Sequence, residues 1–470
     1  MTNPLQIAAK QFGDQVALID ERRQLTYREY WAAVCSTVEW LEKAGVSPGD
    51  IVGISATARI EYVILLQAVW AFGAAAAPGR RQAEAPAECR LRITDDPTLL
   101  HRGTALPLAE VGAVSDHSIP TNLAGRAVDI DLPATLLSTS GSSAEPKWVQ
   151  HRYASHYFSA LGSNENIMLR PGDRWLLNLP LYHVSGLSII FRAMLAGAGI
   201  VIKPEEQTLG HTIRQFGITH LSLVHTQLKR LLEEDPDDST VRNLRAVLVG
   251  GSAIPAGMIT RAHAAGLPLF TTYGSTEMAS QVTTTRPDDP LECLLTSGCP
   301  LPHREIQIAG DGEILARGRT RFDGYVLGGQ LLRPFDPNGW FRTGDIGEID
   351  NTGYLTVRGR KDRMFISGGE NIYPEDIEKA LLELEEIGLA VVVPTDDDEW
   401  GRRPVAAIGF TDSPRNENEL RAILAGKLPG YLIPDEFYLW DSRVGDAKPS
   451  PVEVSRLLSQ NRLARVSPDS

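Results

Sequence analysis

Residues 137–151, LSTSGSSAEPKWVQH, combine the residue types that can hold a polyphosphate. Hydroxyl side chains surround one glycine and a lysine follows them: Ser138, Thr139, Ser140, Gly141, Ser142, Ser143 and Lys147. Such a loop can turn backbone N–H groups, hydroxyls and one ammonium toward phosphate oxygens. It is not a Walker A loop, because Pro146 and Trp148 stand where that motif has glycine and Ser or Thr. Taken alone, this composition is more often that of a polar surface loop.

A second motif, YGSTE, directly follows the predicted strand PLFTT: Tyr273, Gly274, Ser275, Thr276 and Glu277. An aromatic ring can stack on a nucleobase, a threonine hydroxyl can bind phosphate, and a glutamate can hold Mg²⁺. An ordinary turn with an acidic residue in the first turn of a helix explains the same residues about equally well.

Two further segments follow predicted strands and could bind a nucleoside. Gly250-Gly251-Ser252 comes after LRAVLV, and two glycines let the backbone approach a ring or a ribose closely. In isolation, a strand-to-helix turn capped by Ser252 is a slightly better explanation. Asp345, in WFRTGD, could accept both ribose hydroxyls, as acidic residues do in dinucleotide sites. The alternative is an Asx-turn.

A polar, glycine-flanked stretch at residues 359–363, GRKDR, is a candidate domain junction. It contains Arg360, Lys361 and Asp362, and the Gly368-Gly369 pair follows in SGGENIYP. A Gly-Gly loop beside a hinge can absorb large changes of the backbone angles. The alternative is a plain hairpin loop.

Two single residues depend on their context for any functional meaning. Lys448 lies in a segment rich in Pro and Ser near the end of the chain, where a lone lysine is usually a solvated charge. His183, in LPLYHVSG, follows a predicted strand, and a lone histidine is more often structural than catalytic.

The elements that must position these residues alternate between strands and helices. VALID, DIVGISA and AAAAP are predicted strands, and TYREYWAAVCSTVEWLEKAG and IEYVILLQAVWAFGA are predicted helices between them. Thr26 is the predicted N-cap of the first helix, and Gly45 follows its end. The alternation resumes over residues 174–274, whereas residues 80–132 show little periodicity. This pattern predicts doubly wound α/β sheets with ligands at the carboxyl ends of the strands.

The pattern changes near Pro300. Short alternating strands with Asp-Gly and Asn-Thr-Gly turns predict a β-rich subdomain that extends to the candidate junction. Beyond it, PEDIEKALLELEEIG, LAVVVP, PVAAIGF and ENELRAILAGKLPG predict a small α+β domain.

Composition restricts the class of protein. A chain of 470 residues can form two or more domains, and its net charge of −13 argues against a general nucleic-acid binder. The four cysteines form no CxxC pair, which favours reduced thiols over a zinc site. The first residues lack a signal-peptide pattern, and the most apolar run, residues 62–78, is predicted to be a buried helix. A cytoplasmic protein without membrane insertion is expected.

Together and in this order, the loop, YGSTE, TGD, GRKD, GGENIYP and a late lysine resemble the adenylate-forming superfamily, which includes acyl-CoA synthetases. The resemblance covers essentially the whole chain. It implies a large N-terminal domain, residues 1–360, and a small C-terminal domain, residues 361–470, that rotates about a hinge at 361–362. It also implies that a carboxylate is joined to the α-phosphate of MgATP, pyrophosphate leaves, and the acyl group then passes to a thiol, usually that of coenzyme A.

The resemblance implies a role for each motif residue. The phosphate loop would bind the phosphates of the nucleotide, and Thr276 would contact a phosphate as well. Tyr273 would pack on adenine, with the Gly250–Ser252 segment beside it. Asp345 would bind the ribose hydroxyls, with Arg360 close to them. The full expected ATP-binding set is Thr139, Ser140, Gly141, Ser142, Ser143, Lys147, Gly250, Gly251, Ser252, Tyr273, Gly274, Thr276, Asp345 and Arg360. Glu277 would bind Mg²⁺, and Lys448 would reach the carboxylate and the α-phosphate. The expected catalytic residues are Lys448, His183, Thr276 and Glu277, and the expected CoA or hinge residues are Lys361, Asp362, Gly368 and Gly369.

Three stretches, LPLYHVSGLSIIFR, LSLVHTQLKRLL and YGSTEMASQVTT, resemble more narrowly the o-succinylbenzoate–CoA ligases of menaquinone biosynthesis. The acyl substrate would then be an aromatic dicarboxylic acid. The residues expected around it are His183, Ser185, Gly186, Leu187, His225, Thr226, Ser280, Gln281 and Gly298.

Three positions depart from the superfamily pattern. Ala144 and Trp148 stand where the phosphate loop usually has glycine, and Ala447 replaces the glycine before the late lysine. The alternatives that follow are another aryl- or acyl-CoA ligase, an adenylation enzyme that loads a carrier protein, and a nucleotide-binding regulator without turnover. The expected partners are a small carboxylic acid, ATP and CoA, with monomer and homodimer both open.

Overall fold

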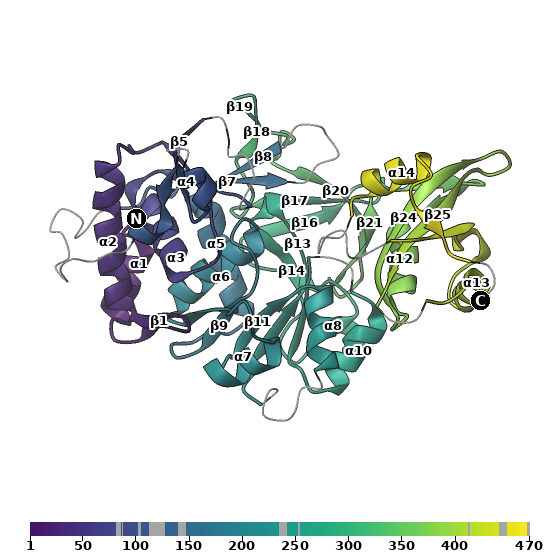
Figure 1. The fold of residues 1–470 in the computed structure, drawn as a ribbon, viewed down its shortest axis with the longest axis horizontal. Helices are drawn as coiled ribbons and strands as arrows, with labels where there is room; N and C mark the ends of the chain where they lie inside the picture. Colours follow the sequence, from purple (N-terminus) through teal and green to yellow (C-terminus); the bar gives the residue numbers. More distant parts are fainter. Residues whose placement is uncertain are drawn as a thin grey trace.

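The structure is a computed structural model, and it describes residues 1–80, 86, 88–101, 105–111, 127–139, 147–234, 242–251, 254–411, 414–440 and 449–467. Figure 1 shows a large α/β body that contains the N-terminal part of the chain and a smaller body formed by the C-terminal elements. The α/β class and the division into a large and a small body are as the sequence predicts.

One sheet of the large body carries the end of the phosphate-loop segment. Among the described residues its strand order is β19 (Gln330–Leu332), β18 (Gly324–Leu327), β8 (Lys147–Arg152), β7 (Pro133–Thr139), β4 (Ala75–Pro78), β3 (Ile51–Ser55), β5 (Cys89–Thr94) and β6 (Leu106–Pro107). Strands β7, β4, β3, β5 and β6 are parallel, and β8, β18 and β19 continue the sheet in antiparallel pairs. The KWVQ segment therefore forms a strand, as predicted.

The second sheet positions the YGSTE motif. Its order in the described chain is β15 (Cys299–Pro300), β14 (Ser280–Thr284), β13 (Leu269–Ser275), β12 (Ala246–Val249), β11 (His220–Leu223), β9 (Arg174–Leu177), β10 (Gly199–Ile202), β1 (Val16–Ile19) and β2 (Gln24–Thr26). The central pairs from β13 to β1 are parallel. Strands β10, β11 and β12 are buried along their whole length, which explains their continuous apolar sequences.

The main hydrophobic core joins residues from both sheets to the helices that pack against them. Its helices are α1 (Pro4–Gln11), α2 (Tyr27–Lys43), α3 (Ile60–Phe72), α5 (Tyr153–Asn166) and α6 (Val184–Ala196). As predicted, Thr26 caps α2, and its hydroxyl accepts a hydrogen bond from the Glu29 N–H. Helix α3 is buried on all sides, as expected for a core helix, but it ends at Phe72, and residues 75–78 of the predicted helical run 62–78 form β4 instead.

The opposite face of the second sheet is covered by another group of helices, which form their own apolar cluster with it. These are α7 (Leu209–Phe216), α8 (His225–Glu233), α10 (Ala256–Ala264) and α11 (Leu291–Leu294). Short elements complete this body: α4 (Pro97–His101), η1 (Leu108–Glu110) and η2 (Thr276–Met278). None of the described helices combines the length and apolar composition needed to cross a membrane.

A four-stranded antiparallel sheet within the described chain connects the large body to the small one. It consists of β16 (Arg304–Ile308), β17 (Glu313–Gly318), β20 (Phe341–Ile349) and β21 (Leu355–Arg360), and it confirms the predicted β-rich subdomain. Figure 1 shows β20 and β21 between the two bodies.

The small body has its own hydrophobic clusters, which draw on residues from Phe365 to Val466. Its strands are β22 (Phe365–Ser367), β23 (Glu370–Ile372), β24 (Ile387–Asp397), β25 (Gly401–Phe410), β26 (Glu436–Leu439) and β27 (Ala464–Arg465). Its helices are α12 (Pro374–Leu382), α13 (Glu417–Ala425), η3 (Gly430–Leu432) and α14 (Pro451–Ser459). This is the α+β arrangement that the sequence predicts.

Candidate active site

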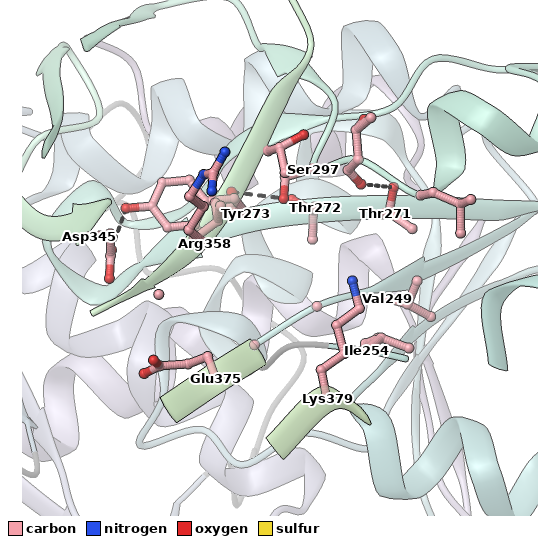
Figure 2. A pocket seen from close by; sticks show the side chains of 18 of the residues that line it. Val249, Ile254, Thr271, Thr272, Tyr273, Ser297, Asp345, Arg358, Glu375 and Lys379 are labelled. Atoms are coloured by element: carbon pink, nitrogen blue, oxygen red, sulfur yellow. Dashed lines mark hydrogen bonds between the residues drawn. The ribbon is translucent and has the colours of Figure 1, made fainter. Parts of the chain in front are cut away.

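A cavity of about 460 Å³ opens where β12 and β13 end, and elements of both bodies line it. Figure 2 shows Val249, Thr271, Thr272 and Tyr273 from these strands on one side and residues of α12 on the other. The lining includes Gly250, Gly251, Tyr273, Gly274, Asp345 and Arg360. Six of the residues predicted to bind ATP are therefore brought together. Four of them lie at the carboxyl ends of the parallel strands β12 and β13, where open α/β sheets bind ligands, and Asp345 and Arg360 come from the antiparallel strands β20 and β21.

Asp345 is the centre of the polar group in this cavity. The Tyr273 hydroxyl donates a hydrogen bond to its Oδ2 at 2.6 Å, and the Arg360 guanidinium lies 3.5 Å from its Oδ1. Burial raises the pKa of Asp345, while Tyr273 and Arg360 act in the opposite direction. The carboxylate is thus partly desolvated but held by donors on both sides. A ribose that replaced some of these donors could offer two hydroxyls to the same oxygens.

The charge of Asp345 also raises the pKa values of its two hydrogen-bond donors, Tyr273 and Arg360. Burial, followed by the charge of Asp345, raises the pKa of the Tyr273 hydroxyl well above its ordinary value. Burial alone would lower the pKa of Arg360, but Asp362 and Asp345 more than offset this and the pKa is raised. Both groups therefore remain protonated donors at neutral pH.

Glu277 lies just beyond the cavity, on the turn η2. Its Oε1 accepts a hydrogen bond from the Tyr325 hydroxyl at 2.9 Å, and the Lys147 ammonium stands 5.8 Å from the centre of the Tyr325 ring. Tyr325 thus connects the lysine of the phosphate loop to the predicted metal ligand. Tyr325 was not predicted from the sequence, although a tyrosine in the glycine-rich segment FDGYVLGG is a usable signal.

The phosphate loop itself is only partly described. Strands β7 and β8 form a hairpin that ends with the Thr139–Lys147 pair. Ser140, Gly141, Ser142, Ser143 and Ala144 lie outside the described residues, as do Ser252, Ala447 and Lys448.

Trp148 has a packing role in this sheet. It pairs with Ser138 and Val326 on the neighbouring strands and packs against the apolar cluster formed by Ala75, Ala77 and Leu136. A tryptophan in place of the usual glycine therefore adds apolar contact between β8 and the neighbouring strands of the sheet.

The start of α6 carries four of the residues expected at the acyl substrate. His183 precedes the helix, and its backbone carbonyl accepts hydrogen bonds from the N–H groups of Gly186 and Leu187 at 3.1 and 3.2 Å. A Cβ on Gly186 would lie 2.3 Å from the Pro180 carbonyl oxygen, so only glycine fits there. The chain around His183 desolvates its ring and, together with Arg80, lowers its pKa. The imidazole is therefore mainly neutral at pH 7.

Further along α6, Arg192 reaches the residues that follow the YGSTE motif. Its guanidinium donates to the Gln281 Oε1 at 2.6 Å and to the Ser280 hydroxyl at 3.4 Å. Gln281 is also held by the Ser163 hydroxyl at 2.7 Å. Two predicted acyl-site residues, Ser280 and Gln281, are thus joined to α6.

Arg192 is a functional candidate that the sequence analysis missed. It is 1% exposed, its guanidinium stands 5.1 Å from the centre of the Trp175 ring, and within the described chain it forms no ion pair with a carboxylate. Burial lowers its pKa to about 9. Burial of an unpaired guanidinium is unfavourable, which points to an anionic ligand. The available signal was a lone arginine in the apolar helix sequence SIIFRAML.

The remaining acyl-site candidates are more dispersed. His225 is buried at the start of α8, next to Val224, which contacts the region of Gly251, whereas Thr226 is exposed. Gly298 has φ +77°, and a Cβ there would lie 2.0 Å from the Thr284 carbonyl carbon. Its neighbour Ser297 lines the cavity.

The candidate hinge lies at the end of β21. The Lys361 ammonium is 2.8 Å from the Asp311 Oδ2 and 3.0 Å from the Glu313 Oε2, while its N–H donates to the Gly344 carbonyl. Asp362 is 3.2 Å from the Arg360 Nε. The hinge candidates thus contact the β-rich subdomain rather than the cavity.

The glycine pair forms the turn between β22 and β23. Gly368 has φ +57° and Gly369 has φ +90°, and a Cβ on Gly368 would lie 2.5 Å from the Trp400 ring. Both positions therefore require glycine.

The small body closes one side of the cavity through α12. Glu375, Asp376 and Lys379 belong to its lining, and Figure 2 shows the Lys379 side chain above Ile254. Farther out, the Lys229 ammonium donates to the Glu385 carbonyl at 2.7 Å. Contacts between the two bodies thus include polar ones at an exposed surface.

Comparison with known proteins agrees with this geometry. The family described as AMP-binding enzyme matches residues 5–326, and the AMP-binding enzyme C-terminal domain matches residues 376–444. The 2-succinylbenzoate–CoA ligases of Bacillus licheniformis and Bacillus subtilis are each 32% identical to this chain. Each alignment covers 91% of this chain, together with 93% of the B. licheniformis protein and 92% of the B. subtilis protein.

Solved structures show the same similarity. The o-succinylbenzoate CoA synthetase of Bacillus subtilis in complex with the acyl-adenylate intermediate is 30% identical, covers 99% of both chains and has a TM-score of 0.86. The same enzyme in complex with ATP and magnesium ion is 30% identical and has a TM-score of 0.83, with 94% of this chain and 96% of that chain covered. The chain therefore belongs to the family of AMP-binding enzymes.

Proposed function

We propose that the protein is an ATP-dependent carboxylate–CoA ligase and that its acid is o-succinylbenzoate. The observation that carries the proposal is the cavity in which Tyr273 and Arg360 hold Asp345 beside the Gly250-Gly251 turn, since this arrangement suits adenosine. The activities of relatives that align over most of the chain support the choice of reaction and of acid.

In the first step, a carboxylate oxygen of the acid attacks the α-phosphorus of ATP. A bond forms between that oxygen and phosphorus, the bond to the bridging oxygen breaks, and pyrophosphate leaves with its electron pair. Tyr273 would face adenine and Asp345 the ribose, while Lys147, Thr276 and Lys448 would stabilise the charge on the phosphates. Their contribution is chiefly orientation and electrostatic stabilisation.

Glu277 is the residue that would hold Mg²⁺. The described chain contains no group of three or more His, Cys, Asp or Glu residues suited to a metal ion. A single carboxylate nevertheless fits Mg²⁺, which usually combines one or two carboxylates with phosphate oxygens and water. Tyr325 fixes the direction of the Glu277 carboxylate by its hydrogen bond. Mg²⁺ bound there would neutralise negative charge on the phosphates.

Arg192 provides a reason to expect a second carboxylate on the acid. The guanidinium is buried beside Ser280 and Gln281 and has only neutral partners among the described residues. A dicarboxylic acid could place one carboxylate near Arg192 and present the other to ATP. His183, Ser185, Gly186, Leu187, His225, Thr226 and Gly298 complete the proposed acyl site.

In the second step, the CoA sulfur forms a bond with the acyl carbon, and AMP leaves as the acyl–oxygen bond breaks. We assign residues 1–360 to the domain that binds ATP and the acid, and residues 361–470 to a domain that rotates about Lys361 and Asp362. Separate hydrophobic clusters in the two bodies support this division. Gly368 and Gly369 would then move toward the site for the thiol reaction.

Pyrophosphate exchange with a panel of carboxylic acids tests the proposal. Exchange of labelled pyrophosphate into ATP should depend on o-succinylbenzoate and be weak with benzoate and with straight-chain fatty acids. Exchange with another acid would identify a different acyl ligase. Transfer of the adenylated acid to a carrier protein but not to CoA would favour the carrier-loading alternative, and no exchange with any acid would favour a regulator.

The proposed location is the cytoplasm, where ATP and CoA are both available. Monomer and homodimer are alternatives for the assembly, and sedimentation of the purified protein distinguishes them.

A further inference from the structure

The turn that carries Thr276 and Glu277 is strained. After the short helix η2, Ala279 has φ +52° and Ser280 has φ +106°. Residues other than glycine rarely adopt positive φ, and two in succession persist only where neighbouring elements fix the backbone. The elements that fix this turn therefore control where the Thr276 and Glu277 side chains lie.

Three carbonyl oxygens of the turn accept hydrogen bonds from other elements. The His151 Nε2 on β8 donates to the Thr276 oxygen at 2.7 Å, the Phe322 N–H to the Glu277 oxygen at 2.7 Å, and the Ser159 hydroxyl on α5 to the Ala279 oxygen at 2.7 Å. The hydrogen bond from His151 therefore holds Thr276, the residue proposed to contact phosphate. Thr276 immediately precedes Glu277.

The chemistry of the partners determines the proton positions on His151. A carbonyl oxygen can only accept, so the Nε2 of the neutral ring carries the hydrogen and its Nδ1 is an acceptor. The Thr135 hydroxyl, 3.1 Å away, must then donate to that Nδ1. Since its hydrogen is used, the Thr135 oxygen accepts from the His156 Nε2 at 2.8 Å. The result is a directional chain from His156 through Thr135 and His151 to Thr276.

The three side chains of this hydrogen-bonded series, those of Thr135, His151 and His156, are buried. Thr135 and His151 face each other as partners on β7 and β8, and both are 0% exposed. The His156 ring is 2% exposed and stacks on Phe191, with a centroid distance of 5.2 Å. Burial lowers the pKa of both histidines, so both rings are neutral in the physiological range. A neutral, well-packed ring is suited to hold a carbonyl in one position.

We propose that His151 is a positioning residue for MgATP, which acts by fixing the Thr276–Glu277 turn through the Thr276 carbonyl, with Thr135 and His156 orienting its ring. The inference rests on the proposed function, because it assumes that this turn contacts the phosphates and Mg²⁺. It goes beyond that function by assigning a role to a buried polar chain outside the substrate cavity.

Calorimetric titration with MgATP and, separately, with adenosine tests the role of His151. Adenosine requires the base and ribose subsites but not the Thr276–Glu277 turn. His151→Leu should weaken MgATP binding by about 10- to 100-fold, the range found when a residue that orients a metal ligand is removed. Adenosine affinity should be unchanged. His151→Gln, whose amide can donate to the same carbonyl, should recover most of the lost affinity.

His220→Leu is the matched control. His220 is also 0% exposed, but it begins β11, at the opposite end of the parallel strands from the cavity. The His220→Leu variant should have a lower melting temperature than the parent protein, with unchanged affinities for MgATP and for adenosine. If His151→Leu does not fold, Thr135→Val removes the hydroxyl that orients the ring, and it should weaken MgATP binding selectively in the same way.

Two results would overturn the inference. One is equal weakening of MgATP and adenosine in the His151 or Thr135 variant, because that indicates a general structural effect. The other is unchanged MgATP affinity in a folded variant. A parent protein that binds MgATP but activates no acid would contradict the proposed function alone, since the binding comparison does not depend on turnover.

Discussion

Arg192 is the residue that most directly connects the structure to the choice of acid. Its partners are the neutral side chains of Ser280 and Gln281, and it is buried on a helix that also begins the proposed acyl site. Removal of one partner from a buried, hydrogen-bonded charge pair costs about 2–5 kcal/mol, or roughly 30-fold or more in affinity. The charge of Arg192 should therefore matter only for an acid with a second carboxylate.

We predict that Arg192→Met lowers kcat/KM for o-succinylbenzoate at least about 30-fold and leaves the KM for ATP nearly unchanged. Initial-rate measurements of adenylation with each substrate varied in turn check this. The control is Arg245→Met, because Arg245 precedes β12 at the opposite end of that strand from the cavity, where its exposed guanidinium pairs with the buried Asp173. An equal loss with a monocarboxylic substrate of the same shape would contradict the pairing of Arg192 with a second carboxylate.

His151 gives a prediction about the pH dependence of stability. Burial lowers its pKa to about 4, and the nearby His156 is shifted in the same direction. A histidine with a lowered pKa in the folded state stabilises the fold above its unfolded pKa of about 6.5, and this contribution is lost as the pH falls toward the folded value. For His151 the loss between pH 7 and pH 5 is ~2 kcal/mol.

Denaturant unfolding of the parent and of His151→Gln at pH 7 and pH 5 measures this effect. The parent should lose more stability than the variant between the two values, because the variant lacks one of the buried imidazole rings whose pKa is lowered in the folded state. Comparison of the two proteins cancels the contribution of other groups that titrate in this range. Parallel losses in both proteins would show that His151 is not the group responsible.

At the level of elements, the start of α6 places the proposed acyl-site residues through close backbone packing. A Cβ on Gly186 would lie 2.3 Å from the Pro180 oxygen and 2.8 Å from the Leu179 oxygen. These are backbone atoms, so relief requires movement of the helix or of the loop before it. Either movement would displace His183 and Ser185.

Gly186→Ala should therefore destabilise the protein by about 1–3 kcal/mol and raise the KM for the acid more than the KM for ATP. Thermal unfolding and initial rates test the two parts of this prediction. Gly257→Ala in α10 is the control, since a Cβ at that position would have no atom of the described residues within 4 Å. That change should be neutral or stabilising by up to about 1 kcal/mol. Equal behaviour of the two variants would refute the packing argument.

The success of prediction from the sequence differed among the elements for physical reasons. Strands β10, β11 and β12 and helix α3 were predictable, because continuous burial leaves a continuous apolar sequence. The N-terminal helix α1, the helix α5 and the strand β5 were not identified. Strand β5 has the mixed sequence CRLRIT, and α5 has only a weakly apolar face.

The candidate site was predictable where a motif accompanies a predicted strand, although Tyr273 lies within β13 and Asp345 within β20 rather than after a strand. Arg192 and Tyr325 could not be placed from sequence, because their importance arises from contacts across sheets and helices. The same holds for His151, whose partner Thr276 is 125 residues away along the chain.

At the level of the whole molecule, the proposed reaction requires the two bodies to take different relative positions in the two half-reactions. Asp345, Arg360 and residues of α12 all line the cavity, so both bodies contribute to it. The ion pairs of Lys361 with Asp311 and Glu313 are exposed to solvent on the lysine side, and exposed pairs contribute little free energy. Rotation about this segment is therefore compatible with the contacts that the structure shows.

Lys448→Ala should abolish formation of the acyl-adenylate and spare thioester formation from a supplied acyl-adenylate. The reason is that Lys448 would reach the substrates only when the small domain is in the orientation used for the first step. Single-turnover assays of the two half-reactions make the comparison. Equal loss of both steps would remove Lys448 from its proposed role in adenylation.

Identification of the products formed from o-succinylbenzoate, MgATP and CoA tests the proposed reaction. Mass spectrometry with quantification of the nucleotides should find o-succinylbenzoyl-CoA, with AMP and pyrophosphate released in equal amounts to the thioester. Formation of ADP and phosphate, or absence of the thioester while the protein binds ATP, would contradict the account.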